Sequence, residues 1–212
     1  MGYFTVKEKA SAEKIIEKSK FIAYVNRADS REEAEKFIAS IREEHRSATH
    51  NVPAFVIGEN GQIQWASDDG EPQGTSGIPV LNTITGRNLT NVVMVITRYF
   101  GGIKLGTGGL MRAYTAVARE ALDKAGVCEI TDMLAYRVRI PYASFERIRR
   151  EAGKAGYEMS DMVYDDQVTL TLASRPEQKE DVIRLLSDAT QGVLHAGNIQ
   201  TEKIIGISEN EC

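Results

Sequence analysis

The apolar positions near the start of the chain follow first a strand-like and then a helix-like period. Residues 19–25 carry apolar side chains at alternating positions, which predicts a strand. Ser30, followed by Glu33 three residues later, is typical of a capping box at a helix start. The helix that follows is expected to bury a stripe at helical spacing, formed by Ala34, Phe37, Ile38 and Ile41.

Further apolar runs predict a hairpin, a short helix and a buried strand. The runs 52–58 and 62–66 flank an Asn-Gly pair at 60–61, and Asn-Gly between such runs is a strong hairpin signal. After a polar loop, a short helix is expected around 77–85. Residues 91–100, NVVMVITRYF, form a nearly continuous apolar run, as expected for a strand that is covered on both faces.

A glycine-rich segment, GGIKLGTGG at 101–109, is predicted to form a turn that leads into the longest helix. Gly126 is expected to end that helix. Arg112 and Arg119 lie seven residues apart, so they share one side of the helix, opposite its apolar face.

The pattern restarts after Gly126. A strand, a helix, a hairpin turning at 165–166, a second helix and a last strand near 198–206 give the order β-α-β-β-α-β, which is typical of a ferredoxin-like domain. We therefore predict an α+β protein of two domains, residues 1–128 and 129–212.

Composition narrows the class of protein. The 212 residues are 42% hydrophobic and 26% charged, which suits a soluble globular chain. No apolar run approaches the roughly 18 residues of a membrane helix, and the first residues lack the pattern of a signal peptide. Cys128 and Cys212 do not make a disulfide framework or a zinc motif. We expect a cytoplasmic protein that does not associate with membranes.

Charge is distributed unevenly although the formal net charge is only −4. Residues 72–119 contain no Asp or Glu but five cations, whereas residues 1–71 have a net charge of −3 and residues 127–212 a net charge of −5. A buried glycine-rich core would also lack acids, but it would not retain cations. The five cations, Arg87, Arg98, Lys104, Arg112 and Arg119, therefore predict a surface that faces an anion.

The glycine-rich segment is the strongest candidate for such an anion site. A helix N-terminus offers unpaired N–H groups, and glycines let a phosphate approach the backbone. Arg98 and Lys104 bracket the loop, with N–H groups near Thr107 and Gly108 assisting. The dinucleotide and Walker fingerprints both fail at this spacing, and the alternative is a tight turn with a purely structural role.

The carboxylates of the DDGEP segment at 68–72 have three candidate roles. Asp68, Asp69 and Glu71 could hold a divalent cation or act as an acid/base pair. They could instead form an ordinary turn. The explanation we favour is that these carboxylates pair with Arg98 or Arg112 and hold the glycine loop in place.

The three histidines give weaker signals. His45 and His50 are too far apart around a continuous helix to form a metal pair. His50, just before a strand, could reach the glycine loop as a phosphate contact, although a structural role is equally compatible with its position. His195 stands alone and is expected to be structural.

Two long motifs resemble the signature of the IMPACT family in its bacterial two-domain form. They are DDGEPQGTSGIPVL and VVMVITRYFGGIKLGTGGLMRAY, and they follow the histidine-containing EEHRSATHNVPAF. The resemblance implies an N-terminal domain similar to domain IV of elongation factor G and a C-terminal domain similar to domain V. It also implies a link to translation, because eukaryotic relatives regulate translation by competing for the activator of a stress-responsive kinase.

The leading hypothesis is a non-catalytic, translation-associated regulator that binds structured RNA or the ribosome, without a cofactor and without sequence-specific DNA recognition. One alternative is a phosphate- or nucleotide-handling, metal-assisted enzyme that uses the DDGEP segment and His50 around the glycine loop. A second alternative is a regulator that binds a protein partner in translation control through the acid-free segment.

Overall fold

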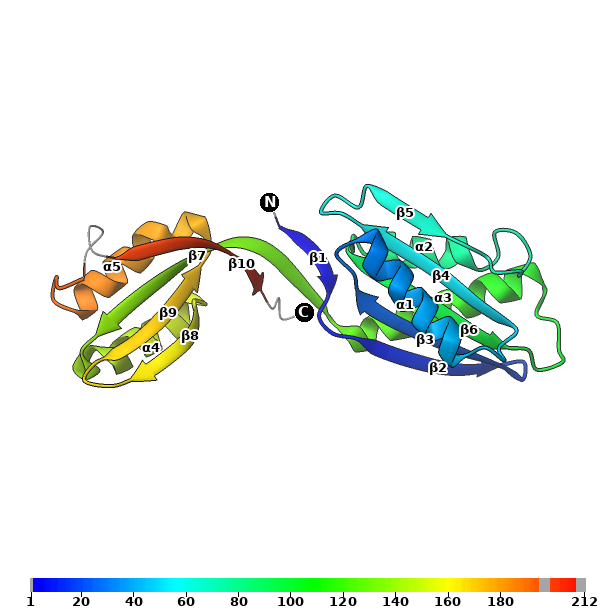
Figure 1. The fold of residues 1–212 in the computed structure, drawn as a ribbon, viewed down its shortest axis with the longest axis horizontal. Coiled ribbons are helices and arrows are strands. Elements are labelled where there is room, and N and C mark those ends of the chain that lie inside the picture. Colours follow the sequence, from blue (N-terminus) through cyan, green and yellow to red (C-terminus); the bar gives the residue numbers. More distant parts are fainter. Residues whose placement is uncertain (1, 195–198, 209–212) are drawn as a thin grey trace. The chain divides into compact units, whose positions relative to one another are not determined.

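The structure is a computed structural model that describes residues 2–194 and 199–208. The chain forms two compact units, Gly2–Glu129 and Ile130–Ile207. Both units combine a β-sheet with helices, so the predicted two-domain α+β class is confirmed (Figure 1). No helix among the described residues is long and apolar enough to span a membrane.

The first unit is built on an antiparallel sheet of five strands (Figure 1). In spatial order these strands are β2 (Ala10–Ile16), β3 (Ser19–Arg27), β6 (Val92–Tyr99), β4 (His50–Ile57) and β5 (Ile63–Ala66). Strand β6 lies at the centre, where Arg98 pairs with Phe21 of β3 on one side and with His50 of β4 on the other. This register brings the end of β6 beside the candidate site.

Helices cover both faces of this sheet, as Figure 1 shows. Helix α1 (Arg31–Glu44) packs on one face with Ala34, Ile38 and Ile41. Helices α2 (Gly77–Thr85) and α3 (Gly106–Ala125) pack on the other face, over alternate residues of β3 and β6. Because both faces are buried, β6 is apolar on both sides, as its sequence predicted.

The predicted start of α1 is present with one difference. The Ser30 side chain accepts a hydrogen bond from the N–H of Glu33, as a helix cap should. The Glu33 carboxylate accepts from the N–H of Asp29 rather than from that of Ser30. The chain therefore satisfies two backbone donors, but the reciprocal bond is shifted by one residue.

The sequence did not predict β2 or β1 (Tyr3–Val6). Within β2 only Ala12 is buried, so the strand lacks an apolar stripe that a period of two could reveal. Helix α3 also begins inside the expected turn, because residues 106–109 are already helical. The turn before α3 is therefore shorter than its glycine content suggested.

The second unit has the predicted ferredoxin-like order of elements. The sheet has the strand order β1-β7-β9-β8, and β10 also pairs with β7; the β7–β9 and β9–β8 pairs are antiparallel. The elements are β7 (Val127–Ile140), α4 (Tyr142–Ala155), β8 (Glu158–Tyr164), β9 (Val168–Ser174), the 3-10 turn η1 (Pro176–Gln178), α5 (Lys179–Ala189) and β10 (Gln200–Ser208). Its core joins Tyr136 and Leu170 of the sheet to Ile148 and Leu186 of the helices. The boundary between the two units falls within β7.

Candidate functional site

The loop between β5 and α2 contains the three carboxylates of the DDGEP segment, and Asp68 holds the start of α2. Its carboxylate accepts hydrogen bonds from the N–H groups of Gly74 (2.7 Å), Ser76 (3.1 Å) and Gly77 (2.9 Å), and from the Ser76 hydroxyl (2.8 Å). Burial acts to raise the pKa of Asp68, but these hydrogen bonds outweigh it and hold the pKa below its usual value. Asp68 is therefore an anionic cap supplied from outside the helix.

Asp69 ties the same loop to the opposite side of the sheet. Its carboxylate receives the N–H of Asn51 at 2.6 Å and Nη2 of Arg42 at 2.9 Å. Asp69 has a φ of 49°, in the left-handed region that Asp tolerates better than most residues. The loop is thereby fixed against both β4 and α1.

Glu71 lies at the centre of a buried polar cluster. Its Oε1 accepts from Nη1 of Arg98 at 2.7 Å and from the hydroxyl of Tyr114 at 2.7 Å. Nη2 of Arg98 donates to the Ser19 hydroxyl at 3.2 Å. Burial, reinforced by the Glu71 carboxylate, raises the pKa of Tyr114. The cluster thus joins the DDGEP loop to β6, α3 and β3.

Arg98 also lies between two aromatic rings. Its guanidinium carbon is 5.2 Å from the ring centroid of Phe21 and 5.5 Å from that of Phe100. Arg98 is only 5% exposed. This burial corrects the expectation that Arg98 contacts a phosphate directly, because its charged group faces Glu71 and the aromatic rings instead. The favoured pairing between the DDGEP carboxylates and Arg98 is present, whereas Arg112 does not take part in it.

His50 lies against the DDGEP loop with 18% of its side chain exposed. Its Nδ1 donates to the carbonyl oxygen of Asp69 at 2.8 Å, and its Nε2 is 3.8 Å from Oε2 of Glu71. His45 is separate, with its two ring nitrogens hydrogen-bonded to the hydroxyls of Tyr24 and Tyr99. His195 lies outside the described residues.

The three carboxylates do not converge on one point. Each has its own partners within the first unit, and no group of His, Cys, Asp and Glu that could hold a metal occurs in residues 2–194 and 199–208. Instead, Asp68 bonds to the start of α2, Asp69 bonds to β4 and α1, and Glu71 bonds to β6 and α3.

The glycine loop that precedes α3 is packed tightly at one end and open at the other. A Cβ at Gly101 would lie 2.0 Å from the carbonyl group of Lys18, so the loop presses on the β2–β3 turn. Gly102 and Gly106 have φ values of 84° and 70°, which favour glycine. Lys104, Thr107 and Gly108 are exposed.

The start of α3 lacks the side-chain caps found on α1 and α2. Leu105 precedes the helix and makes no capping hydrogen bond, and no acid lies in the first turn. The backbone donors of this turn therefore remain available to an anion.

The five cations of the acid-free segment divide into two groups. Arg87 pairs with Asp123 at 2.6 Å, and Arg98 pairs with Glu71. The other three are exposed and make no ion pair within the described part of the chain: Lys104, Arg112 and Arg119. The structure therefore leaves three cations rather than five on the outside of this segment.

Exposed apolar side chains accompany these cations, and sequence reasoning missed them. Phe100 is 47% exposed, and Ile103 and Met111 are also exposed. Lys18 lies on the turn that contacts Gly101, and it too is exposed. The sequence predicts Phe100 as the last residue of a buried strand, whereas β6 ends at Tyr99 and Phe100 is exposed. The two glycines that follow Phe100 are the sequence signal for this strand end.

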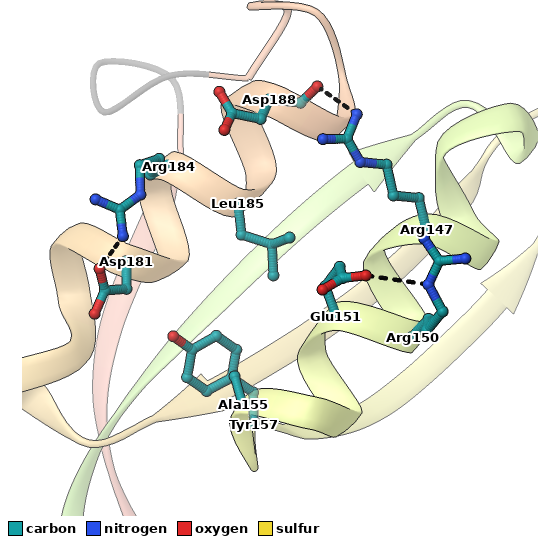
Figure 2. A pocket seen from close by; sticks show the side chains of 9 residues that line it. All are labelled: Arg147, Arg150, Glu151, Ala155, Tyr157, Asp181, Arg184, Leu185 and Asp188. Carbon is teal, nitrogen blue, oxygen red and sulfur yellow. Dashed lines mark hydrogen bonds and ion pairs between the residues drawn. The ribbon is translucent and has the colours of Figure 1, made fainter.

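The second unit has a groove between α4 and α5, of about 590 Å³ (Figure 2). Its arginines are paired locally: Arg184 with Asp181 at 2.5 Å, Arg150 with Glu151 at 3.1 Å, and Arg147 with the carbonyl oxygen of Asp188 at 3.1 Å. Because acids and cations alternate along it, the groove has no field of one sign to attract a charged ligand.

Comparison with known proteins identifies the class to which this architecture belongs. A family model described as the Impact N-terminal domain matches residues 17–122, and one described as a domain of unknown function matches residues 138–193. The chain therefore belongs to the IMPACT family, as its two motifs predicted.

Two bacterial relatives illustrate the similarity. IMPACT family member YvyE of Bacillus subtilis strain 168 is 40% identical over 191 residues, which cover 90% of this chain and 88% of YvyE. IMPACT family member YigZ of Escherichia coli K12 is 33% identical over 181 residues, which cover 84% of this chain and 89% of YigZ. A crystal structure of a hypothetical protein is 28% identical, covers 99% of this chain and 98% of its own, and has a TM-score of 0.60.

The Asp68 cap should make stability depend on pH. We expect Asp68→Ala to lower the free energy of unfolding by about 1–2 kcal/mol at pH 7, as for the loss of a helix cap. The pKa of Asp68 is lower in the folded than in the unfolded chain, so its contribution is full above the unfolded value near 4 and is lost as pH falls through the folded value. Urea unfolding at pH 7 and at acidic pH should show the variant and the natural chain converging in acid. A difference that stays constant with pH would contradict this role.

The buried Glu71–Arg98 pair should be far more sensitive than an exposed pair. Glu71→Ala leaves the Arg98 charge buried and is expected to lower the unfolding free energy by about 3–5 kcal/mol. The control is Glu35→Ala, which removes an exposed partner of Arg31 and should cost less than about 1 kcal/mol. Urea denaturation of both variants tests the difference, and equal losses would show that the buried cluster is unimportant.

Gly101 should tolerate no side chain. Gly101→Ala would force a Cβ against the Lys18 carbonyl, and we expect a loss of about 1–3 kcal/mol from overpacking. Gly108→Ala is the matched control, because its Cβ would meet only the flexible end of Arg112 at 3.4 Å. Thermal unfolding should therefore leave Gly108→Ala unchanged or slightly stabilised. The close approach would be refuted by a Gly101→Ala protein as stable as the natural chain.

Proposed function

We propose that this protein is a non-catalytic, translation-associated regulator that binds structured RNA or the ribosome through the start of α3. One observation carries the proposal: Lys104 and Arg112 are exposed and free of ion pairs within residues 2–194 and 199–208, near helix donors that no side chain caps. Arg119 is likewise exposed and unpaired there, but it lies further along α3. Phosphate groups suit both features, because they accept hydrogen bonds and are negatively charged.

The arrangement of the acids supports binding rather than catalysis. Asp68, Asp69 and Glu71 are each held by several donors of the first unit, and a metal-assisted enzyme would need such carboxylates to converge on a ligand. Glu71 is buried and Asp69 is paired with Arg42, so neither adds an unpaired negative charge beside the glycine loop. These contacts therefore favour an anion-binding role over a metal-assisted one.

The negative charge of residues 127–212 disfavours contact between this part of the chain and RNA. Residues 127–212 have a net charge of −5, so this half is repelled by a polyanion. The cationic start of α3 is therefore the part of the first unit that we expect to face the phosphates. The link to translation rests on the implied roles of the IMPACT family, to which the chain belongs.

Removal of two unpaired cations tests this proposal. We expect Lys104→Ala with Arg112→Ala to weaken co-sedimentation with ribosomal subunits and to reduce the slope of log affinity against log salt by about 1.5–2. The matched control is Arg31→Ala with Lys36→Ala on α1, which removes the same charge from cations that already pair with Glu35 and Glu32. The control should bind as the natural chain does.

Two results would count against the proposal. Unchanged affinity and salt slope in the Lys104/Arg112 variant would exclude this surface. Binding to whole subunits that is sensitive to the variant, combined with no binding to purified ribosomal RNA, would favour the alternative of a protein partner. Arg98 is not part of the test, because its substitution would disturb the buried cluster.

A further inference from the structure

We propose that the start of α3 recognises an unpaired nucleotide of the RNA, with its base stacked on the outer face of Phe100. This inference rests on the proposed function and specifies the part of the RNA that is bound. Bases in loops, bulges and ends of RNA are free to stack on aromatic side chains, and this stacking tolerates any base because every base has a π-face.

Phe100 offers a ring face of the required kind. The Arg98 guanidinium lies over one face of the ring, 5.5 Å from its centroid, and Phe100 is 47% exposed, so we assign stacking to the other face. An aromatic ring this exposed carries an unfavourable contact with water, which a stacked base would remove. The arrangement would place the base, the ring and the guanidinium in successive layers.

The backbone on both sides of Phe100 is fixed, so stacking would order little that is mobile. The N–H of Phe100 donates to the Thr49 hydroxyl at 3.0 Å, and the N–H of Gly101 donates to the Ser19 hydroxyl at 3.2 Å. Gly101 also presses against the carbonyl of Lys18. A pre-organised ring binds more tightly than a mobile one, because less entropy is lost on association.

Two cations lie near this ring, one on a neighbouring turn and one later in the same loop. Lys18 lies on the turn that Gly101 contacts, and Lys104 follows Phe100 by four residues; both are exposed and without an ion pair in the part of the chain that the structure describes. Glu17, also exposed, is the acid next to Lys18. A base on Phe100 would therefore place the adjoining phosphates within a region of net positive charge.

A second role for Phe100 must be separated from stacking. The ring also shields the Arg98–Glu71 pair, so a substitution can act through stability alone. Phe100→Leu keeps an apolar cover but removes the aromatic face, and Phe100→Tyr keeps both. These two variants distinguish an aromatic surface for RNA from a simple cover.

The test measures fluorescence anisotropy with a labelled single-stranded oligouridylate and with a blunt RNA duplex of equal length. We expect Phe100→Leu to weaken binding of the single strand by roughly 5- to 100-fold, as for the loss of one stacked base, with the salt slope unchanged because no phosphate contact is lost. Phe100→Tyr should bind nearly as the natural chain does. Trp65→Leu, which removes another exposed aromatic side chain of the same unit, should also have no effect.

Each other outcome has a distinct meaning. Loss of binding in the Lys104/Arg112 variant but not in Phe100→Leu would overturn stacking and leave the proposed function intact. No effect of either variant, or no binding of RNA at all, would overturn both. Equal loss in Phe100→Leu and Phe100→Tyr, or a loss in Phe100→Leu that follows the fraction unfolded by circular dichroism, would assign Phe100 the role of a cover only.

Discussion

The ion pair between Glu71 and Arg98 is the interaction on which the arrangement of the first unit's loops depends. Removing two charges from water is expensive, and a buried pair is tolerated only when its remaining hydrogen-bonding groups are satisfied. Here Tyr114 and Ser19 provide further hydrogen bonds, and Phe21 and Phe100 enclose the guanidinium. Nε of Arg98 has no partner among the described residues, so the cluster is not fully satisfied. Its value is positional, since it fixes the DDGEP loop, the end of β6 and helix α3 with respect to one another.

That positioning determines which charges reach the surface. Glu71 pairs with the buried Arg98. Asp69 accepts a hydrogen bond from the backbone of Asn51 and pairs with Arg42, and Asp68 accepts hydrogen bonds from the start of α2. The loop beside the glycine segment therefore contributes its acids to the interior contacts. Arg112 and Arg119 of α3 have no acid on their own helix before Glu120, and Glu120 pairs with Lys14 and Lys124, so these two arginines remain exposed to solvent. The same set of contacts therefore gives a neutral buried pair and leaves unpaired cations at the start of α3.

Much of this fold could be predicted from the sequence because local signals agree with the final structure. The alternation in β3, the Asn-Gly turn before β5, the Ser30 cap and the apolar run of β6 each specify one element. Strand β2 could not be predicted from the sequence, because an edge strand with a single fully buried residue has no apolar pattern. The ion pairs that two of the cations form could not be predicted for another reason. The partners of Arg87 and Arg98, Asp123 and Glu71, lie outside the acid-free segment in sequence, and only the tertiary structure brings them within reach.

The three helices of the first unit differ in how their N-terminal N–H donors are satisfied, and only α3 has donors that no side chain of the described residues caps. Ser30 caps α1 and Asp68 caps α2, but Leu105 offers α3 no acceptor. Glycines at 108 and 109 lower the stability of this first turn further, by up to about 1 kcal/mol each relative to alanine, whereas Gly106, with a φ of 70°, is where the backbone itself favours glycine. A sequence selected for helix stability alone would place Ser or Asp before α3 and alanine within it. An open turn with small residues, next to unpaired Lys104 and Arg112, is instead what close approach of a phosphate backbone requires.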